Sequence, residues 1–232
     1  MPALSLKLAR AAQAAFLALA FLSSACSAQD ESAPPAAKGK AAAAQQYKAG
    51  EHYTELGTPV QPEVAPGQIE VLEFFLYTCP HCHHFEPVIT PWSEQLPNHI
   101  VFRRVPANFG PSAAIYARAH YTAETLGVLD KVRPALFHAI HDERRTVDNE
   151  AELAKLFQRA AGIEEKAFKE TFGSFAVDNQ VRKADALTRA YAITGVPAVT
   201  VAGKYVVSPR QGGSFENMLK IVDALTAKEK VN

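Results

Sequence analysis

Residues 69–82 read IEVLEFFLYTCPHC, a mostly hydrophobic run that ends in two closely spaced cysteines. Its first part, Ile69 to Tyr77, is rich in β-branched and aromatic residues, which is typical of a buried central strand. Pro80 suits the first position of a helix, because proline lacks the N–H group that would be unpaired there. We therefore predict a strand that leads through Cys79 directly into a helix running toward Leu96.

Further strands and helices can be predicted after this junction. A second strand is expected at His99 to Val105, where β-branched and aromatic residues recur. Apolar residues at helical spacing then continue from Ser112 to Ala192, strand character returns at Ala198 to Ser208, and a last helix is expected at Phe215 to Ala227. This order predicts an α/β protein in which a helical domain is inserted into a domain built around a sheet.

The composition of the 232-residue chain suits a globular protein and argues against several functions. Hydrophobic residues make up 48% of the chain and charged residues 21%, so a full core can form without disulfide staples. Lys+Arg and Asp+Glu number 24 each, which leaves no basic excess for binding nucleic acid. The 3 cysteines are too few for a disulfide framework, so a closely spaced pair is better explained by chemistry.

Residues 1–28 have the layout of an export signal peptide. Basic residues without acids come first, the apolar run Ala11 to Leu22 follows, and small residues end the segment. The apolar run is short for a transmembrane helix, and it lacks the polar face of an ordinary surface helix. We therefore expect this segment to be removed on export.

Two cleavage sites are compatible with the predicted signal. Cleavage after Ala28 would release a plainly secreted protein. Cleavage after Ala25 would leave Cys26 first, which resembles a bacterial lipoprotein signal, in which that cysteine is acylated. Residues 29–46 are rich in Ala, contain two prolines and no large apolar side chain, and are expected to form a linker that suits either outcome.

The pair Cys79 and Cys82 indicates thiol–disulfide chemistry. The thiolate is the form that attacks a disulfide, and a cysteine at a helix N-terminus faces unpaired N–H groups that lower its pKa. Cys79 is therefore the predicted nucleophile, Cys82 the resolving partner, and His81 a source of positive charge beside the Cys79 sulfur. Each unit by which the pKa falls below the ambient pH stabilises the dithiol by roughly 1.4 kcal/mol, so such a pair is expected to give its disulfide away.

Two motifs give the chain a resemblance to a known family. VLEFFLYTCPHC at residues 71–82, followed by FEP, and GVPAV at residues 195–199 are similar to motifs of DsbA-type periplasmic thiol:disulfide oxidoreductases of the thioredoxin superfamily. The resemblance implies a thioredoxin-like fold with a helical domain inserted into it. In this chain the thioredoxin-like domain would comprise residues 47–111 and 176–230, and the inserted helical domain residues 112–175.

The resemblance also implies an activity and its partners. The chain would be a protein dithiol oxidase that donates the Cys79–Cys82 disulfide to reduced, unfolded exported proteins, and a DsbB-like membrane quinone reductase would reoxidise the pair. It would act in the periplasm as a monomer, either soluble or anchored through Cys26. The disulfide itself would be the redox group, with no bound cofactor, no metal and no nucleic-acid partner.

Further site residues follow from the same resemblance. Pro80 belongs to the CPHC motif. Val196 and Pro197 would form a cis-proline loop that lies against the cysteine pair and binds an extended peptide. Glu73 aligns with a buried acid that lies behind the pair and can assist proton transfer from the inner cysteine, Cys82.

The carboxylates near the motif also have simpler interpretations. A carboxylate is expensive to bury, so Glu73 could point to a solvated face of its strand, and this interpretation is credible for Glu70. Glu86, one helical turn beyond Cys82, is expected to be an exposed helix residue that only modulates the local field.

Alternative functions stay open at this point. Residues 79–83 match the C-x-x-C-H pattern of haem attachment, with Met218 or another histidine available as the far axial ligand. A zinc site on both cysteines and a following histidine would lack the second cysteine pair that closes a structural tetrahedron. The same fold could serve a reductase, an isomerase or a peptide-binding chaperone, although the short segment before Tyr47 supplies no dimerisation module for an isomerase.

Overall fold

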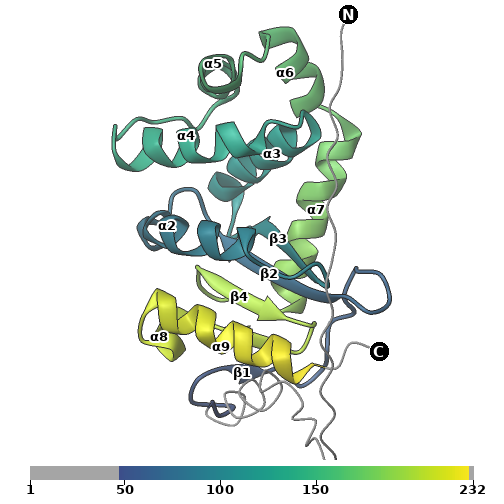
Figure 1. Cartoon of the computed structure of the whole chain (residues 1–232). Helices are drawn as coiled ribbons and strands as arrows, with labels where there is room; N and C mark the ends of the chain where they lie inside the picture. Colours follow the sequence, from purple (N-terminus) through teal and green to yellow (C-terminus); the bar gives the residue numbers. More distant parts are fainter. Residues whose placement is uncertain (1–46, 230–232) are drawn as a thin grey trace, which may run out of the picture. The chain divides into compact units, whose positions relative to one another are not determined.

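The computed structural model describes residues 47–229. The predicted signal peptide, Cys26 and the linker lie outside the described residues, so these expectations stay predictions. None of the described helices is both long and apolar enough to cross a lipid bilayer. The described chain forms a mixed sheet with helices on both of its faces (Figure 1).

The sheet of the described residues is ordered β1, β5, β4, β2, β3. Its strands are β1 (Thr54–Glu55), β2 (Ile69–Phe75), β3 (Ile100–Pro106), β4 (Ala198–Val201) and β5 (Tyr205–Val207). The helices are α2 (Pro80–Glu94), α3 (Pro111–Thr125), α4 (Leu129–His141), α5 (Glu150–Ala161), α6 (Glu165–Phe172), α7 (Phe175–Ala190), α8 (Pro209–Gly212) and α9 (Phe215–Lys228). The α/β architecture predicted from the sequence is confirmed.

β2 is buried along its whole length, as its sequence predicts. It pairs in parallel with β3 and antiparallel with β4. Because successive side chains of a strand point to opposite faces, Val71 packs in a core with α2 and α9, whereas Leu72 packs in a core with residues of α3 and α7. The end of β2 is thereby held rigidly from both sides, and α2 begins five residues later.

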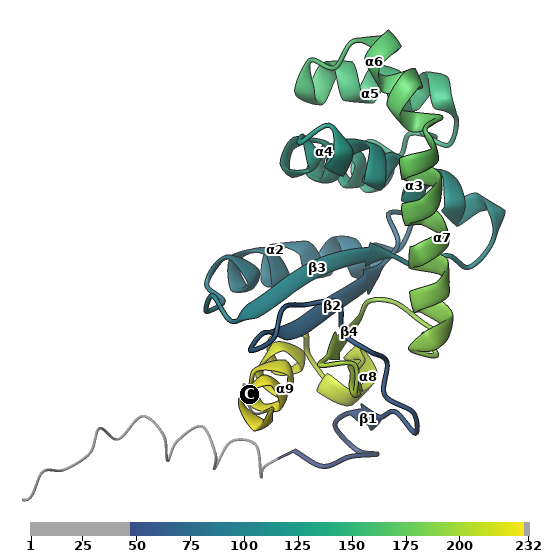
Figure 2. The ribbon, with the colours of Figure 1, turned by 90° about the vertical axis from the view of Figure 1, so that its right-hand side faces the viewer.

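The helices α3 to α7, residues 111–190, form a helical block between β3 and β4. Figure 2 shows α7 returning from this block alongside the sheet. The core of the block includes Phe137 and Leu153, and it extends to Phe75, Tyr77 and Cys82 at the junction between β2 and α2. The block therefore packs directly against the redox motif.

A tight hairpin sets the position of β4. Ala202 and Gly203 both have positive φ angles, 53° and 69°, as a two-residue turn between twisted strands requires. A Cβ atom on Gly203 would lie 1.8 Å from the carbonyl oxygen of Val60, so only glycine fits there. The turn holds β4 in place, and β4 begins directly after Val196 and Pro197.

Candidate active site: the cysteine pair and its surroundings

Cys79 is the N-cap residue of α2. Its backbone is extended, with φ −87° and ψ 117°, and Pro80 occupies the first helical turn, as the sequence predicts. The Cys79 sulfur makes no side-chain capping hydrogen bond. The sulfur nevertheless lies at the first turn of α2, where backbone N–H groups and the helix dipole stabilise negative charge.

The pKa of Cys79 is lowered from its ordinary value of 9.0 to about 6. The largest cause is the hydrogen bond from the thiol of Cys82, and the backbone N–H groups of Cys82 and His81 add to it against the opposing effect of burial. The positive charge of the exposed His81 contributes last. Cys79 is only partly buried, so its thiolate at neutral pH is accessible to a second sulfur.

Cys82 has the opposite properties. It lies one helical turn further along α2 and is fully buried. Burial raises its pKa, and both its hydrogen bond to Cys79 and the nearby charge of Glu73 add to the increase. The pair therefore combines one accessible thiolate with one protected thiol.

The loop before β4 approaches the nucleophile from the other side. The peptide bond between Val196 and Pro197 is cis, as the resemblance implies. When it is protonated, the thiol of Cys79 donates a hydrogen bond of 3.7 Å to the carbonyl oxygen of Val196. Gly195 is exposed and Val196 only half-buried, so this stretch of backbone is accessible beside the sulfur.

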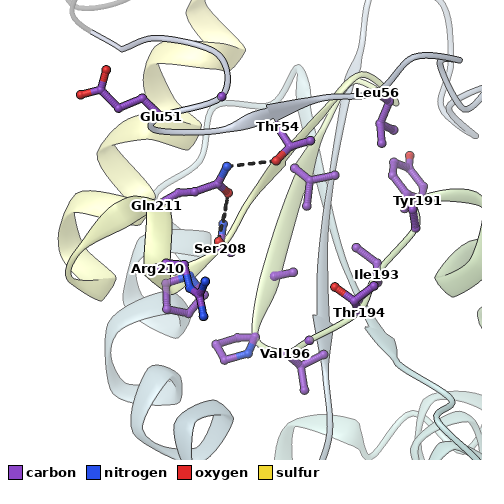
Figure 3. Close-up of a pocket in the computed structure, with 17 residues that line it drawn as sticks. Glu51, Thr54, Leu56, Tyr191, Ile193, Thr194, Val196, Ser208, Arg210 and Gln211 are labelled. Atoms are coloured by element: carbon purple, nitrogen blue, oxygen red, sulfur yellow. Dashed lines mark hydrogen bonds between the residues drawn. The ribbon is translucent and has the colours of Figure 1, made fainter.

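A groove of about 720 Å³ continues from this loop (Figure 3). One wall is held by Gln211, whose side-chain amide donates a hydrogen bond of 3.0 Å to Thr54 Oγ1 on β1. The Oε1 atom of Gln211 accepts hydrogen bonds from the backbone N–H and the hydroxyl of Ser208, at 3.2 Å and 3.0 Å. The resemblance implies that a peptide binds beside this loop, but the side chains of the groove could not be assigned from the sequence, because its walls come from loops far apart in the chain.

Glu73 lies behind the cysteine pair and is completely buried. The Nε atom of Arg104 on β3 lies 3.0 Å from Oε2 of Glu73. Burial raises the pKa of Glu73, and this effect outweighs the opposing charges of Arg104 and Arg133. A carboxyl group of this kind can hold or release a proton near Cys82, which fits the proton-transfer role that remains a prediction for it.

The sequence-based expectation for Glu86 was wrong. Its side chain is only 16% exposed and forms an ion pair with Arg133 of α4. It also accepts a hydrogen bond of 3.3 Å from Thr90 Oγ1. Glu86 is partly buried because the helical block covers this side of α2, which the pattern of α2 alone does not reveal.

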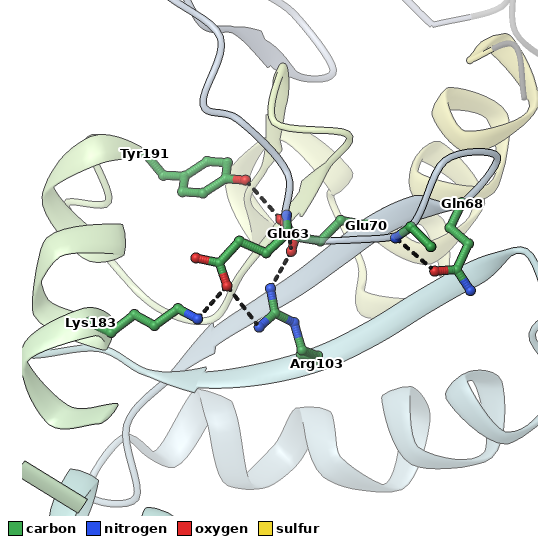
Figure 4. A network of polar contacts seen from close by, with 7 residues as sticks. Glu63, Gln68, Glu70, Arg103, Lys183 and Tyr191 are labelled. Carbon is green, nitrogen blue, oxygen red and sulfur yellow. Dashed lines mark hydrogen bonds and ion pairs between the residues drawn. The ribbon is translucent and has the colours of Figure 1, made fainter. Parts of the chain in front are cut away.

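The expectation of a solvated Glu70 was also wrong. Glu70 is 2% exposed and forms an ion pair with Arg103 on β3 (Figure 4). The backbone N–H of Glu63 donates to Oε2 at 3.2 Å, and the hydroxyl of Tyr191 donates to Oε1 at 3.4 Å. Glu63 in turn contacts Lys183 of α7. Distant segments cover this strand face, and their donors compensate the buried carboxylate.

The histidines of the motif region pack together. The rings of His83 and His141 stack, with centroids 4.8 Å apart and planes inclined by 11°. His141 donates from Nε2 to the carbonyl oxygen of Tyr77 at 2.8 Å.

Met218, the far ligand considered for a haem, is fully buried in the core with α9. Within residues 47–229 no group of three or more His, Cys, Asp or Glu side chains is placed to hold a metal ion.

A strand that leads into a helix N-terminus at a Cys-x-x-Cys pair, beside a cis-proline loop, defines a thiol:disulfide oxidoreductase with the thioredoxin fold. A family model described as DSBA-like thioredoxin domain matches residues 99–213, which include the cis-proline loop. The thiol:disulfide interchange protein DsbA of Pseudomonas aeruginosa is 43% identical over 83% of this chain and 90% of the relative. DsbA of Azotobacter vinelandii is 43% identical over 79% and 85%. The chain therefore belongs to the DsbA family.

Solved structures agree with this assignment. The crystal structure of Pseudomonas aeruginosa DsbA has a TM-score of 0.75 and 41% identity, and the match covers 79% of this chain and 95% of that one. The structure of the oxidoreductase DsbA from Xylella fastidiosa has a TM-score of 0.72 and 33% identity, with coverage of 78% and 97%. The thioredoxin-like fold with its helical insertion is the fold of these relatives.

Proposed function

We propose that the chain is a protein dithiol oxidase that donates its Cys79–Cys82 disulfide to reduced exported proteins during their oxidative folding. The observation that carries the proposal is the asymmetry of the pair. The pKa of Cys79 is lowered to about 6, whereas burial raises the pKa of Cys82. The folded protein thus stabilises the dithiol form, and a pair whose dithiol is stabilised is an oxidant.

The reaction proceeds through a mixed disulfide. A substrate thiolate attacks the Cys79 sulfur, the Cys79–Cys82 bond breaks, and Cys82 leaves with the electron pair and takes up a proton. A second substrate thiolate then attacks the substrate sulfur of the mixed disulfide, and Cys79 leaves as a stabilised thiolate. Two electrons have moved from the substrate to the cysteine pair, which is left as the dithiol.

The cis-proline loop and the groove beside it suit an extended peptide. The half-buried Val196 and the exposed Gly195 offer backbone groups next to the Cys79 sulfur, where a substrate strand can pair. We assign the same surface to a DsbB-like membrane quinone reductase, which would take the electrons and restore the disulfide. The protein would act as a monomer without nucleic acid.

The site of action would be the periplasm. The predicted signal in residues 1–28 supports export, and Cys26 offers a lipid anchor if cleavage follows Ala25. In that case residues 29–46 would tether the catalytic domain to the membrane surface. Mass spectrometry of the mature N-terminus distinguishes an acylated Cys26 from a free terminus after Ala28.

Urea unfolding of the oxidised and reduced protein tests the oxidase function. We expect the reduced form to have the larger free energy of unfolding at neutral pH. Because the pKa of Cys79 is about 6 in the folded state and ordinarily 9.0, this stabilisation is complete above about pH 9 and is lost as the pH falls through about 6. The advantage of the reduced form should therefore shrink in acid.

A Cys79→Ser, Cys82→Ser double variant is the matched control, since its stability should not respond to the redox buffer. A more stable oxidised form would instead favour the reductase or isomerase interpretation. A Soret band in the absorbance spectrum of the same sample would favour the haem interpretation.

A further inference from the structure

A buried arginine of the helical block contacts the active-site helix. Arg133 of α4 is 8% exposed and stands between the buried residues Val132 and Leu136. Its Nη1 atom forms an ion pair with Glu86 of α2. Its Nη2 atom donates a hydrogen bond of 3.3 Å to Oγ1 of Thr90, one turn further along α2. A buried guanidinium is costly unless carboxylates balance its charge, so the groups around Arg133 determine its role.

The hydroxyl of Thr90 joins this ion pair to a second one. Its oxygen also accepts a hydrogen bond of 3.1 Å from Nη2 of Arg104, and Nε of Arg104 lies 3.0 Å from Glu73. Thr90 donates in turn to Oε2 of Glu86 at 3.3 Å. We call Glu73, Glu86, Arg104 and Arg133 the inner charge cluster. It joins strands β2 and β3 to helices α2 and α4.

The inner charge cluster lies beside the resolving cysteine. Cys82 and Glu86 are one helical turn apart and share a face of α2. The negative charge of Glu73 raises the pKa of Cys82, and the charges of Arg104 and Arg133 both lower the pKa of Glu73. A change of charge within the cluster therefore alters the ease with which Cys82 gains or loses its proton.

We propose that Arg133 is a positioning residue for the redox step, because its charge lets Glu73 accept the proton of Cys82. The proposal rests on the oxidase function proposed above and gives the helical block a part in the chemistry. During reoxidation the proton of Cys82 passes to the Glu73 carboxylate, and the Cys82 thiolate attacks Cys79 in a mixed disulfide. The Cys79–Cys82 bond forms and the partner leaves as a thiolate. During reduction of the pair the same proton returns to Cys82.

The other titratable groups around the cluster keep one charge state near neutral pH. Burial lowers the pKa of His120 on α3 to about 3, so this side chain is neutral. Burial raises the pKa of Tyr77, so its hydroxyl keeps its proton. Glu73 interacts electrostatically with Cys82 on α2, Arg104 on β3, Arg133 on α4 and Tyr77 after β2. Around these groups, Glu86 pairs with Arg133 and His120 contacts the hydroxyl of Tyr77.

Reaction with glutathione isolates the step in the full chain. The reduced protein is mixed with excess oxidised glutathione, so that the Cys79 thiolate forms a mixed disulfide and Cys82 then releases the second glutathione. The release rate is followed by rapid quenching and mass spectrometry as a function of pH. We expect Arg133→Met to move the midpoint of this profile upward by about one pH unit, which makes release about tenfold slower at pH values below the midpoint. Arg133→Lys should restore most of the rate.

Glu86→Gln is the matched variant, because it breaks the same ion pair but removes a negative charge. Its midpoint should move to lower pH, opposite to that of Arg133→Met. A merely structural ion pair would make both variants less stable to urea and leave both midpoints in place. If Arg133→Met does not fold, Glu86→Gln and Arg133→Lys still carry the test.

Two results would count against different claims. Folded Arg133→Met and Glu86→Gln variants with the wild-type pH profile would overturn the role of Arg133. A wild-type protein that forms no mixed disulfide with glutathione would instead overturn the proposed oxidase function, on which this step depends.

Discussion

The two buried carboxylates of β2 lie on opposite faces of the same pair of strands. Glu70 faces the side of α7, where Arg103 forms an ion pair with it and the hydroxyl of Tyr191 donates a hydrogen bond (Figure 4). Glu73 faces the side of α2, where Arg104 approaches it to 3.0 Å. The register of β2 with β3 explains this arrangement, because Glu73 lies opposite Arg104 and alternate residues of both strands change face.

The two carboxylates differ in the donors that reach them. Both oxygens of Glu70 accept hydrogen bonds. Within residues 47–229, neither oxygen of Glu73 accepts a hydrogen bond of good geometry, and burial raises its pKa. A buried carboxylate with donors on both oxygens is part of the framework, whereas one that lacks them is available to exchange a proton.

Replacing Glu70 with Ala should have the largest effect on stability, because Glu70 is the carboxylate that has hydrogen-bond donors on both oxygens. Arg103 loses its nearest carboxylate and Tyr191 loses its acceptor. Arg103 keeps 35% of its side chain in water, so we expect a loss of about 2 to 3 kcal/mol in the free energy of unfolding by urea. The rate of disulfide exchange should stay within about twofold, because the change lies on the face away from α2.

Glu55→Ala is the control for Glu70→Ala, since Glu55 is an exposed residue of β1 and its loss should change stability by less than about 0.5 kcal/mol. If exchange became slower in proportion to the lost stability, the two faces of β2 would not be independent.

Glu73→Gln should have a smaller effect that depends on pH. The pKa of Glu73 in the folded protein lies above its ordinary value of 4.5. The folded protein therefore holds the Glu73 proton more tightly than the unfolded chain does. The contribution of Glu73 to stability therefore decreases as the pH rises above about 4.5. Gln does not titrate, so the stability of the variant relative to the wild type should increase from acid to neutral pH in a series of urea curves. Parallel curves for the two proteins would mean that folding leaves the pKa of Glu73 unchanged.

Features that depend on near neighbours in the chain could be predicted from the sequence. The β-branched and aromatic run predicted β2, and Pro80 predicted the helix that starts there. The strand at Ala198–Val201 and the last helix were also found within a residue or two. Their sequence signals are local, because strand burial and helix initiation are read from a few adjacent residues.

Features that depend on distant partners could not be predicted. Glu70 was expected in solvent because nothing near it in sequence announces Arg103 or Tyr191 as its partners. Glu86 was expected to be exposed because its partner, Arg133, lies in another helix. The side chains of the groove beside Val196 could not be assigned for the same reason, since its walls are assembled by tertiary packing. A search for basic residues that could balance Glu70 and Glu73 in their apolar strand would have indicated Arg103 and Arg104 as partners.

Tyr191→Phe should have the smallest effect, and it sharpens the comparison by removing one donor from Glu70. The ring of Tyr191 stays packed against Phe74, so the change removes only the hydroxyl, which donates the hydrogen bond of 3.4 Å to the carboxylate and also contacts Thr200. Because the hydroxyl and its acceptor are both buried, we expect a loss of about 0.5 to 1.5 kcal/mol in urea unfolding, with unchanged exchange kinetics. If Glu70 needs every donor, the loss should approach that of Glu70→Ala. A loss below about 0.5 kcal/mol would show that Arg103 and the backbone N–H of Glu63 suffice to satisfy the carboxylate.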